Sequence, residues 1–213
     1  MRYVLITLAL AALCVPAVVQ AGENPDAKVF MHLAGSEDPM PTNNGEVVNQ
    51  FSPAAYTTIR GYIGVTDFTG FSSLVFRLSD VLVDYPGVVG TQNFVNLLPG
   101  NLAIGDAFGN GEGNSGDGIS LATECAEGPF VLAGYAEWFY LGGDFTVEIL
   151  DHLNTQYNWE GWIVDCQEPG QVDMWCVWLN GAVGAATPPD GDAGCIPVPV
   201  ESATWGAVKA LYR

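Results

Sequence analysis

A glycine-rich segment at positions 105–118 carries the side chains best suited to hold a metal ion. In this segment six glycines are interspersed with acidic and amide residues. Calcium takes six to eight oxygen ligands and tolerates flexible loops. The spacing does not match an EF-hand, and a solvated hairpin loop without metal is the alternative interpretation. The candidate calcium ligands are Asp106, Asn110, Glu112, Asn114 and Asp117.

An aromatic cluster lies in the polar stretch Tyr-Asn-Trp-Glu-Gly-Trp. Tyr157, Trp159 and Trp162 present flat rings beside amide and carboxylate groups, which suits stacking on sugar rings. Exposed aromatic clusters also mark protein interfaces. The alternative is that Trp162 caps the core and Trp159 lies flat on the surface. Three further tryptophans lie within strongly apolar strands, where we expect core positions: Trp138, Trp175 and Trp178.

Catalytic residues are harder to find. Glycoside hydrolysis needs two carboxylates with separated pKa values. Several acids are available, but nothing in their spacing selects a pair: Glu124, Glu127, Glu137, Glu148 and Asp151. The two histidines, His32 and His152, lack the flanking residues of a serine-protease triad. We therefore expect a protein that is not an enzyme, with a glycoside hydrolase as the second alternative.

Charge and composition exclude several classes of protein. The chain has 213 residues, with 24 Asp and Glu against 6 Lys and Arg, a net charge of −18 and 49% hydrophobic residues. Such hydrophobicity excludes a disordered acidic tail, and the missing basic surface argues against a nucleic-acid binder. Between Arg77 and Lys209 there are only acidic charges. High salt, bound calcium or a cationic partner would each offset this repulsion.

The N-terminus has the pattern of a secretory signal peptide. Arg2 precedes an apolar run from Val4 to Val19, and Val19 and Ala21 occupy the −3 and −1 positions of a cleavage site. The run is shorter than the roughly 20 residues that span a bilayer, and no later apolar stretch reaches that length. We predict a signal peptide over 1–21 and a secreted or cell-surface protein.

Four cysteines would remain after cleavage, which suggests two disulfides in an exported protein. Cys125, Cys166, Cys176 and Cys195 allow three pairings. Of these we favour Cys125–Cys166 across a sheet and Cys176–Cys195 joining the tail to the body. Since no Cys-x-x-Cys motif is present and histidine is scarce, a zinc site is not expected.

Short runs of Val, Ile, Phe, Tyr and Trp separated by Gly, Asn, Asp and Pro predict an all-β fold. We expect residues 22–180 to form a single antiparallel β-sandwich of about nine strands. Phe145, Val147 and Ile149 should face inward, and the strand at 129–141 should be buried on both faces. The expected strands are Lys28–Leu33, Thr57–Thr66, Phe71–Leu78, Val88–Leu97, Gly118–Thr123, Pro129–Leu141, Phe145–Asp151, Trp162–Cys166 and Val172–Asn180.

The C-terminal part changes character. Residues 181–200 are rich in Gly, Ala and Pro and are expected to be a linker. Residues 201–213 can form a short amphipathic helix that either docks on the domain or acts as a sorting tag. The residues of this helix that we expect to matter are Trp205, Val208, Lys209, Leu211 and Tyr212.

Two segments resemble known proteins. The segment from Val65 to Leu78 resembles the early strands of cohesin-like sandwiches, in which a Gly-hydrophobic step leads into an alternating strand. The resemblance implies a cohesin or jelly-roll-like sandwich and a non-catalytic module that binds a protein through one sheet face. The ending Thr204-Trp-Gly-Ala-Val-Lys-Ala-Leu-Tyr-Arg213 is similar to the tails of secreted proteins from uncultured bacteria.

These features together predict an exported, non-catalytic adhesion or scaffold module that binds a protein partner. The alternative is a carbohydrate-binding module that holds a polysaccharide through Tyr157, Trp159 and Trp162. Calcium is the one cofactor that the sequence suggests.

Overall fold

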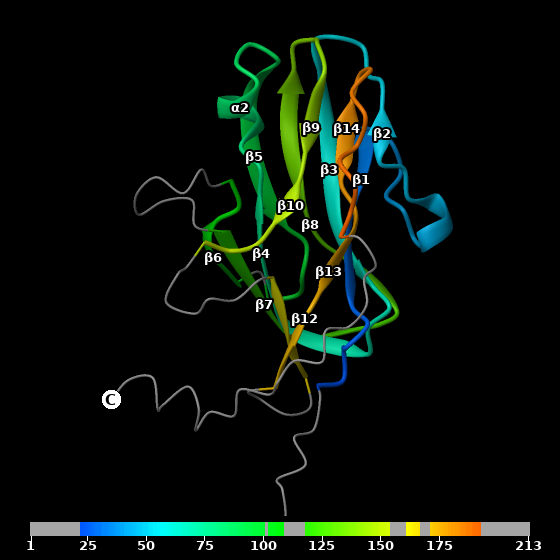
Figure 1. Ribbon diagram of the computed structural model, residues 1–213, viewed down its shortest axis with the longest axis vertical. Coiled ribbons are helices and arrows are strands. Elements are labelled where there is room, and N and C mark those ends of the chain that lie inside the picture. The colour runs from blue at the N-terminus through cyan, green and yellow to red at the C-terminus, as the bar shows by residue number, and fades with distance from the viewer. Residues whose placement is uncertain (1–21, 101, 109–117, 154–160, 167–170, 193–213) are drawn as a thin grey trace, which may run out of the picture.

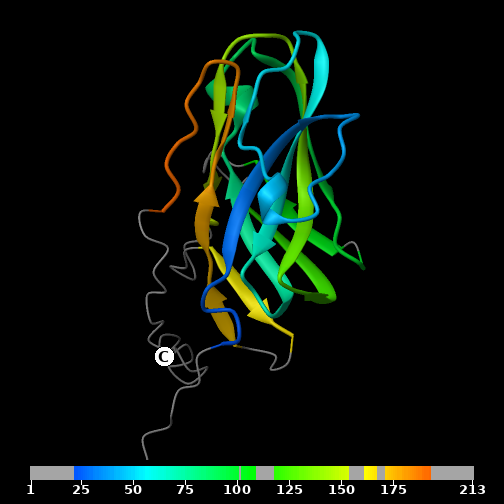
Figure 2. The same cartoon turned by 90° about the vertical axis from the view of Figure 1, so that its right-hand side faces the viewer.

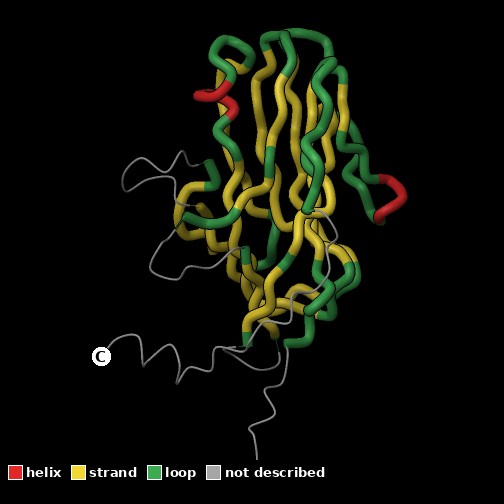
Figure 3. Tube along the Cα trace, in the orientation of Figure 1, coloured by secondary structure: helices red, strands yellow, loops and turns green. Residues whose placement is uncertain are grey.

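The computed structural model describes residues 22–100, 102–108, 118–153, 161–166 and 171–192, and over these residues the fold is all-β (Figure 1). Two short helical turns interrupt the strands (Figure 3). The described residues contain no helix with the length and apolar character of a membrane span. The elements are β1 (Lys28–Gly35), η1 (Asn44–Glu46), β2 (Gln50–Phe51), β3 (Thr57–Thr66), β4 (Gly70–Leu78), α2 (Val81–Asp84), β5 (Val89–Asn96), β6 (Leu102–Asp106), β7 (Gly118–Glu127), β8 (Phe130–Tyr140), β9 (Phe145–Val147), β10 (Ile149–Leu150), β11 (Trp162–Asp165), β12 (Val172–Met174), β13 (Cys176–Leu179) and β14 (Gly181–Val183).

The strands form two main sheets and a small third one. The first sheet has five strands in the order β13-β1-β3-β8-β5, and the second has six, in the order β12-β11-β4-β7-β6 with β10 also paired to β4. The third sheet is β2-β14-β9. Most pairs are antiparallel, but β1 pairs with β13 and β14 pairs with β2 in parallel. Figure 2 shows β13 running beside β1.

The core lies between the inner faces of the two main sheets. Met31 and Trp138 from the first sheet and Phe76 and Ile163 from the second belong to one buried cluster. The rings of Phe76 and Phe94 meet across the two sheets, with centroids 5.8 Å apart. Because side chains alternate along a strand, each sheet keeps a second, outward face.

The predicted strands correspond closely to the observed ones. Thr57–Thr66 has the predicted bounds, and Val172–Asn180 is divided into β12 and β13. The inward positions of Phe145, Val147 and Ile149 are confirmed, since none is more than 2% exposed. The expectation that β8 is buried on both faces is wrong: β8 lies inside its sheet, but Phe139 on its outer face is 38% exposed.

The structure corrects the start of the predicted linker. Gly181, Ala182 and Val183 form β14, are fully buried, and pair with β2 and β9. The folded part therefore continues past residue 180, because small apolar residues here complete a sheet. The remainder of the predicted linker after 192 and the predicted C-terminal helix lie outside the described residues.

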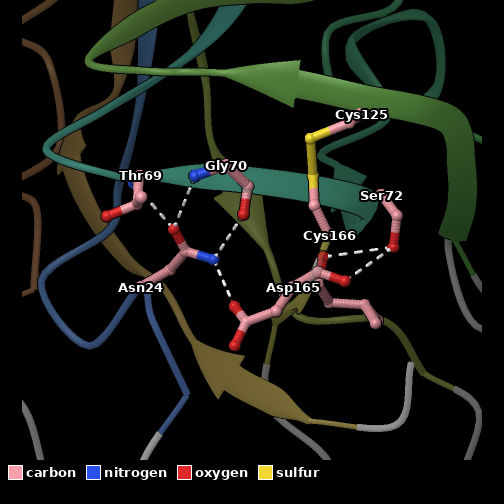
Figure 4. Close-up of a disulfide and its surroundings, with 8 residues drawn as sticks. Asn24, Thr69, Gly70, Ser72, Cys125, Asp165 and Cys166 are labelled. Carbon is pink, nitrogen blue, oxygen red and sulfur yellow. Dashed lines mark hydrogen bonds between the residues drawn. A yellow bond between two sulfur atoms is a disulfide. The ribbon is translucent and has the colours of Figure 1, made fainter. Parts of the chain in front are cut away.

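The predicted disulfide Cys125–Cys166 is present, with its Cα atoms 5.5 Å apart. It joins β7 to the end of β11 and lies over the start of β4, where Gly70 is close to both sulfur atoms (Figure 4). Cys176 is also disulfide-bonded. Its predicted partner, Cys195, lies outside the described residues, so that pairing stays a prediction.

Candidate functional site

The outer face of the six-stranded sheet carries two adjacent rows of side chains that cross five strands. We call this surface the Trp162 face. The strand register places Ile104, Ser120, Val75, Trp162 and Met174 in one row. The second row consists of Leu102, Ala122, Ser73, Val164 and Val172.

The alternation of each strand explains why these residues point outward. Leu74, Leu121 and Ile163 are core residues with 0% exposure, and each lies between members of the two rows on its own strand. Since successive side chains of a strand point to opposite faces, the neighbours of these core residues must face away from the core.

The Trp162 face is apolar and uncharged. Its only polar side chains are Ser73 and Ser120, whose hydroxyl oxygens lie 3.4 Å apart. The nearest charged side chain on β4 is Arg77, two residues after Val75. Its Nε donates to the backbone oxygen of Asp151 at 3.1 Å. Burial lowers the pKa of Arg77, against the opposing effect of the nearby carboxylates, Asp151 first. None of the acidic residues that give the chain its net charge of −18 belongs to the two rows of this face.

Exposure on this face is greatest at the sheet edge. Ile104 and Leu102 on β6 are 64% and 53% exposed, whereas Val75 on the central strand β4 is 2% exposed. Trp162, Val164 and the other members of the rows are half-buried. Within the described part of the chain, β6 is the last strand of its sheet. An edge strand with exposed apolar side chains is a template for pairing with another chain.

The outer face of the five-stranded sheet is also aromatic, but much of it is covered by the protein itself. Phe30, Tyr62 and His32 there are 0%, 1% and 6% exposed. Val48 donates its backbone N–H to Nδ1 of His32 at 2.9 Å, so the segment before β2 lies over this face. Burial lowers the pKa of His32, although Asp38 and Glu46 raise it in part. The most exposed apolar side chains of the two outer faces lie at the β6 edge, where Ile104 and Leu102 exceed the 38% exposure of Phe139.

The structure places one of the three predicted aromatic ligand-binding residues. Trp162 lies on β11 between Val75 and Met174 of the Trp162 face, and Tyr157 and Trp159 lie outside the described residues. The predicted core tryptophans behave differently from one another. Trp138 is 0% exposed, and Trp175 is 6% exposed and donates to the backbone oxygen of Val75 at 3.0 Å. Trp178 is half-buried, with its ring 6.0 Å from that of Phe30.

The predicted calcium site falls almost entirely outside the described residues. Asp106 is exposed at the end of β6, and its Oδ1 accepts a hydrogen bond of 3.0 Å from the backbone of Phe108. Asn110, Glu112, Asn114 and Asp117 are not described. No group of three metal-ligating side chains occurs among the described residues. Calcium therefore stays a prediction.

Two buried carboxylates, Asp165 and Asp173, form a pair that the sequence analysis did not single out. They are 1% and 3% exposed and face the core side of β11 and β12. Both accept backbone hydrogen bonds of 2.7 Å, from Glu23 and Asn24 respectively. Burial, followed by the negative charge of Asp165, raises the pKa of Asp173. The pair thus binds the segment at 23–24, and the inward position of Asp165 could have been found from the alternation in Trp-Ile-Val-Asp at 162–165.

The carboxylates considered for hydrolysis are spread over several elements, with Asp151 and Glu148 both near Arg77. Glu137 forms a salt bridge of 2.9 Å with Arg60, whose guanidinium lies 4.7 Å from the ring centre of Tyr135. Oδ1 of Asp151 accepts a hydrogen bond of 2.9 Å from the backbone of Gly161. Glu124 and Glu127 are exposed on β7, and Glu148 lies between β9 and β10. Glu137 thus links β8 to β3 through Arg60, and Asp151 holds the backbone at Gly161.

No protein-family model, curated protein or solved structure matches this chain. The likeness to cohesin-like sandwiches and the likeness of the C-terminal tail therefore stay predictions from the sequence. What the geometry provides is an all-β fold with one uncharged sheet face, on which Trp162 of β11 lies beside the central strand β4.

Proposed function

We propose that this chain is an exported, non-catalytic adhesion or scaffold module that binds a protein partner through the Trp162 face. The observation that carries the proposal is the uncharged row from Ile104 to Met174, which is apolar except at Ser120 and most exposed at the edge strand β6. Apolar, charge-depleted centres with aromatic residues are typical of protein interfaces. The Cys125–Cys166 disulfide supports an oxidising, extracellular location.

The edge strand suggests how the partner binds. A strand of the partner added beside β6 would use the outer backbone groups of that strand, while Leu102 and Ile104 contact its side chains. The long-range repulsion between acidic proteins favours a partner that is neutral or basic around the contact.

The experiment compares two variants that add the same charge to opposite faces. Ile104→Lys adds a charge to the Trp162 face, at a residue that is 64% exposed. Phe139→Lys adds a charge to the outer face of the five-stranded sheet, at a residue that is 38% exposed. Each immobilised protein captures proteins from the secreted and surface fraction of the source organism, and mass spectrometry identifies them. We expect a partner that wild type and Phe139→Lys retain and Ile104→Lys loses. Capture that is equal for all three proteins contradicts the proposal.

A carbohydrate-binding module is the alternative because the half-buried Trp162 places an aromatic ring on the outer face of the six-stranded sheet. A pull-down on insoluble polysaccharides, with calcium and with chelator, tests it directly. Binding that is abolished by Trp162→Ala and unchanged by Phe139→Lys would replace the protein partner with a polysaccharide. Calcium dependence would add the segment at 105–118 to the site.

A further inference from the structure

The first described residues of the chain lie on two buried aspartates. The backbone N–H of Glu23 donates to Oδ2 of Asp165, and that of Asn24 donates to Oδ2 of Asp173, both at 2.7 Å. The two carboxylates are 1% and 3% exposed. The segment at 23–24 is therefore held by backbone N–H groups directed at buried carboxyl oxygens.

Asn24 fixes this arrangement in place (Figure 4). Its Nδ2 donates to the backbone oxygen of Gly70 at 2.8 Å and also to Oδ1 of Asp165. Its Oδ1 accepts hydrogen bonds of 2.8 and 3.3 Å from the backbone nitrogens of Thr69 and Gly70. At 1% exposure, Asn24 is anchored to β4, which determines where the two preceding residues lie.

Gly22 is in direct contact with the Asp173 carboxylate. A Cβ atom built on Gly22 would lie 2.1 and 2.5 Å from the two carboxylate oxygens, so a side chain does not fit here without a shift. A hydrogen bond from the Gly22 backbone lowers the pKa of Asp173, against the larger opposing effect of burial.

The pair lacks a compensating cation in the described part of the chain. The salt bridges there are Lys28–Asp67 at 2.7 Å and Arg60–Glu137 at 2.9 Å, and neither involves Asp165 or Asp173. The groups that donate to the pair are neutral amides, and a side-chain hydrogen bond between the two carboxyl groups raises the pKa of Asp173. Buried carboxylates are costly unless they are paired with positive charge and hydrogen-bonded.

We propose that the Ala21–Gly22 peptide bond is a processing site, and that its hydrolysis creates an α-ammonium group at Gly22 that pairs with Asp173 and Asp165. The sequence places a signal-peptidase cleavage pattern, with Val19 at −3 and Ala21 at −1, before this glycine. Water supplies the oxygen of the new Ala21 carboxylate, the C–N bond breaks, and the Gly22 nitrogen becomes a protonated amine.

Processing then stabilises the folded domain. The backbone nitrogen of Gly22 already donates a hydrogen bond to Asp173 as an amide. After cleavage the same nitrogen carries a positive charge, and the chain does not need to rearrange. Charge-assisted hydrogen bonds are roughly twice as strong as neutral ones, and more so away from water. Export and folding are thereby coupled, since the most stable form exists only after cleavage.

The test compares the chain that begins at Gly22 with the same chain extended by the single residue Ala21. Both are purified with oxidised disulfides and unfolded in urea at pH 7. We expect the extension to reduce the folding equilibrium constant about tenfold or more, as for a lost hydrogen bond to a charged group. Because Asp173→Asn removes the charge, the effect of the extension should nearly vanish in that variant, or in Asp165→Asn if the first does not fold.

Asp67→Asn is the matched control, because this carboxylate pairs with Lys28 and should leave the effect of the extension unchanged. N-terminal mass spectrometry of the exported protein is the second measurement, with Gly22 as the expected first residue. Equal folding constants for the two chains, an extension effect that survives Asp173→Asn, or a native N-terminus at another residue overturns the proposal.

Discussion

At the scale of single residues, burial changes how polar side chains titrate. His32 is 6% exposed, and its Nδ1 accepts the Val48 N–H at 2.9 Å. Burial lowers the pKa of His32 from the ordinary value of 6.5, so the unfolded chain takes up a proton before the folded chain does. The stability contributed by neutral His32 is therefore complete above pH 6.5 and lost as the pH falls below that value.

The variant His32→Asn tests whether His32 causes this loss of stability at low pH. The amide oxygen of asparagine can take the place of Nδ1 as an acceptor but does not titrate in this range. We expect wild type to lose more stability than His32→Asn between pH 7 and pH 5, measured by urea unfolding. Two parallel curves would show that His32 is not the cause.

The sequence predicted residues whose role follows from local alternation, and missed those fixed by distant contacts. Phe145, Val147 and Ile149 alternate with polar residues, which predicts the inward positions that they occupy. Asn24 and Asp165 meet although 141 positions separate them, and no local pattern connects them. Trp162 was selected for its ring, but its position between Val75 and Met174 depends on the pairing of three strands.

At the scale of elements, the Cys125–Cys166 disulfide joins two strands on either side of β4. It closes a loop with a sequence separation of 41. Restricting the unfolded chain over a loop of this length contributes roughly 4 kcal/mol. We expect the double variant Cys125→Ser, Cys166→Ser to lose that much unfolding free energy in urea. A loss below about 1 kcal/mol would show that the bond does not constrain the unfolded chain as this model assumes.

A second prediction at this scale concerns the contribution of strand β14 to stability. Val183 is 0% exposed between β2 and β9, whereas Thr187 a few residues later is exposed. Val183→Asp buries an unpaired charge and should cost at least about 3 kcal/mol of unfolding free energy. Thr187→Asp should change it by less than about 0.5 kcal/mol. Similar effects for the two variants would mean that residues after 180 do not belong to the folded unit.

The elements themselves were largely predictable, and the missed ones share a reason. Strong runs of β-branched and aromatic residues gave β3, β4 and β8 with bounds close to those observed. β2 has two residues, and β14 consists of Gly, Ala and Val, so neither has an alternating pattern long enough to detect. β6 is short and lies beside a glycine-rich segment, which hides its pairing with β7.

At the scale of the whole molecule, the net charge of −18 opposes compaction. Salt shortens the Debye length from about 10 Å at 0.1 M to about 3 Å at 1 M. We therefore expect the melting temperature to rise with sodium chloride over this range, in the presence of a chelator that removes calcium. A melting temperature that is constant or falls with salt would show that repulsion between the carboxylates does not limit stability.

The overall architecture confirms the all-β prediction, but the choice of binding face required the structure. Composition predicts an apolar core and an acidic exterior, and it does not reveal that ten side chains from five strands form one uncharged surface. That surface depends on the order β12-β11-β4-β7-β6, which is not the order along the chain.

The central claim is that a protein partner binds the Trp162 face at the edge strand β6. Photo-crosslinking tests it most directly, with a photoreactive amino acid at position 104 and, as the control on the other sheet, at position 139. Both side chains are exposed, so both variants should fold. The account predicts a crosslinked protein adduct from position 104 and none from position 139. An adduct from position 139 alone would place the interface on the five-stranded sheet and contradict the account.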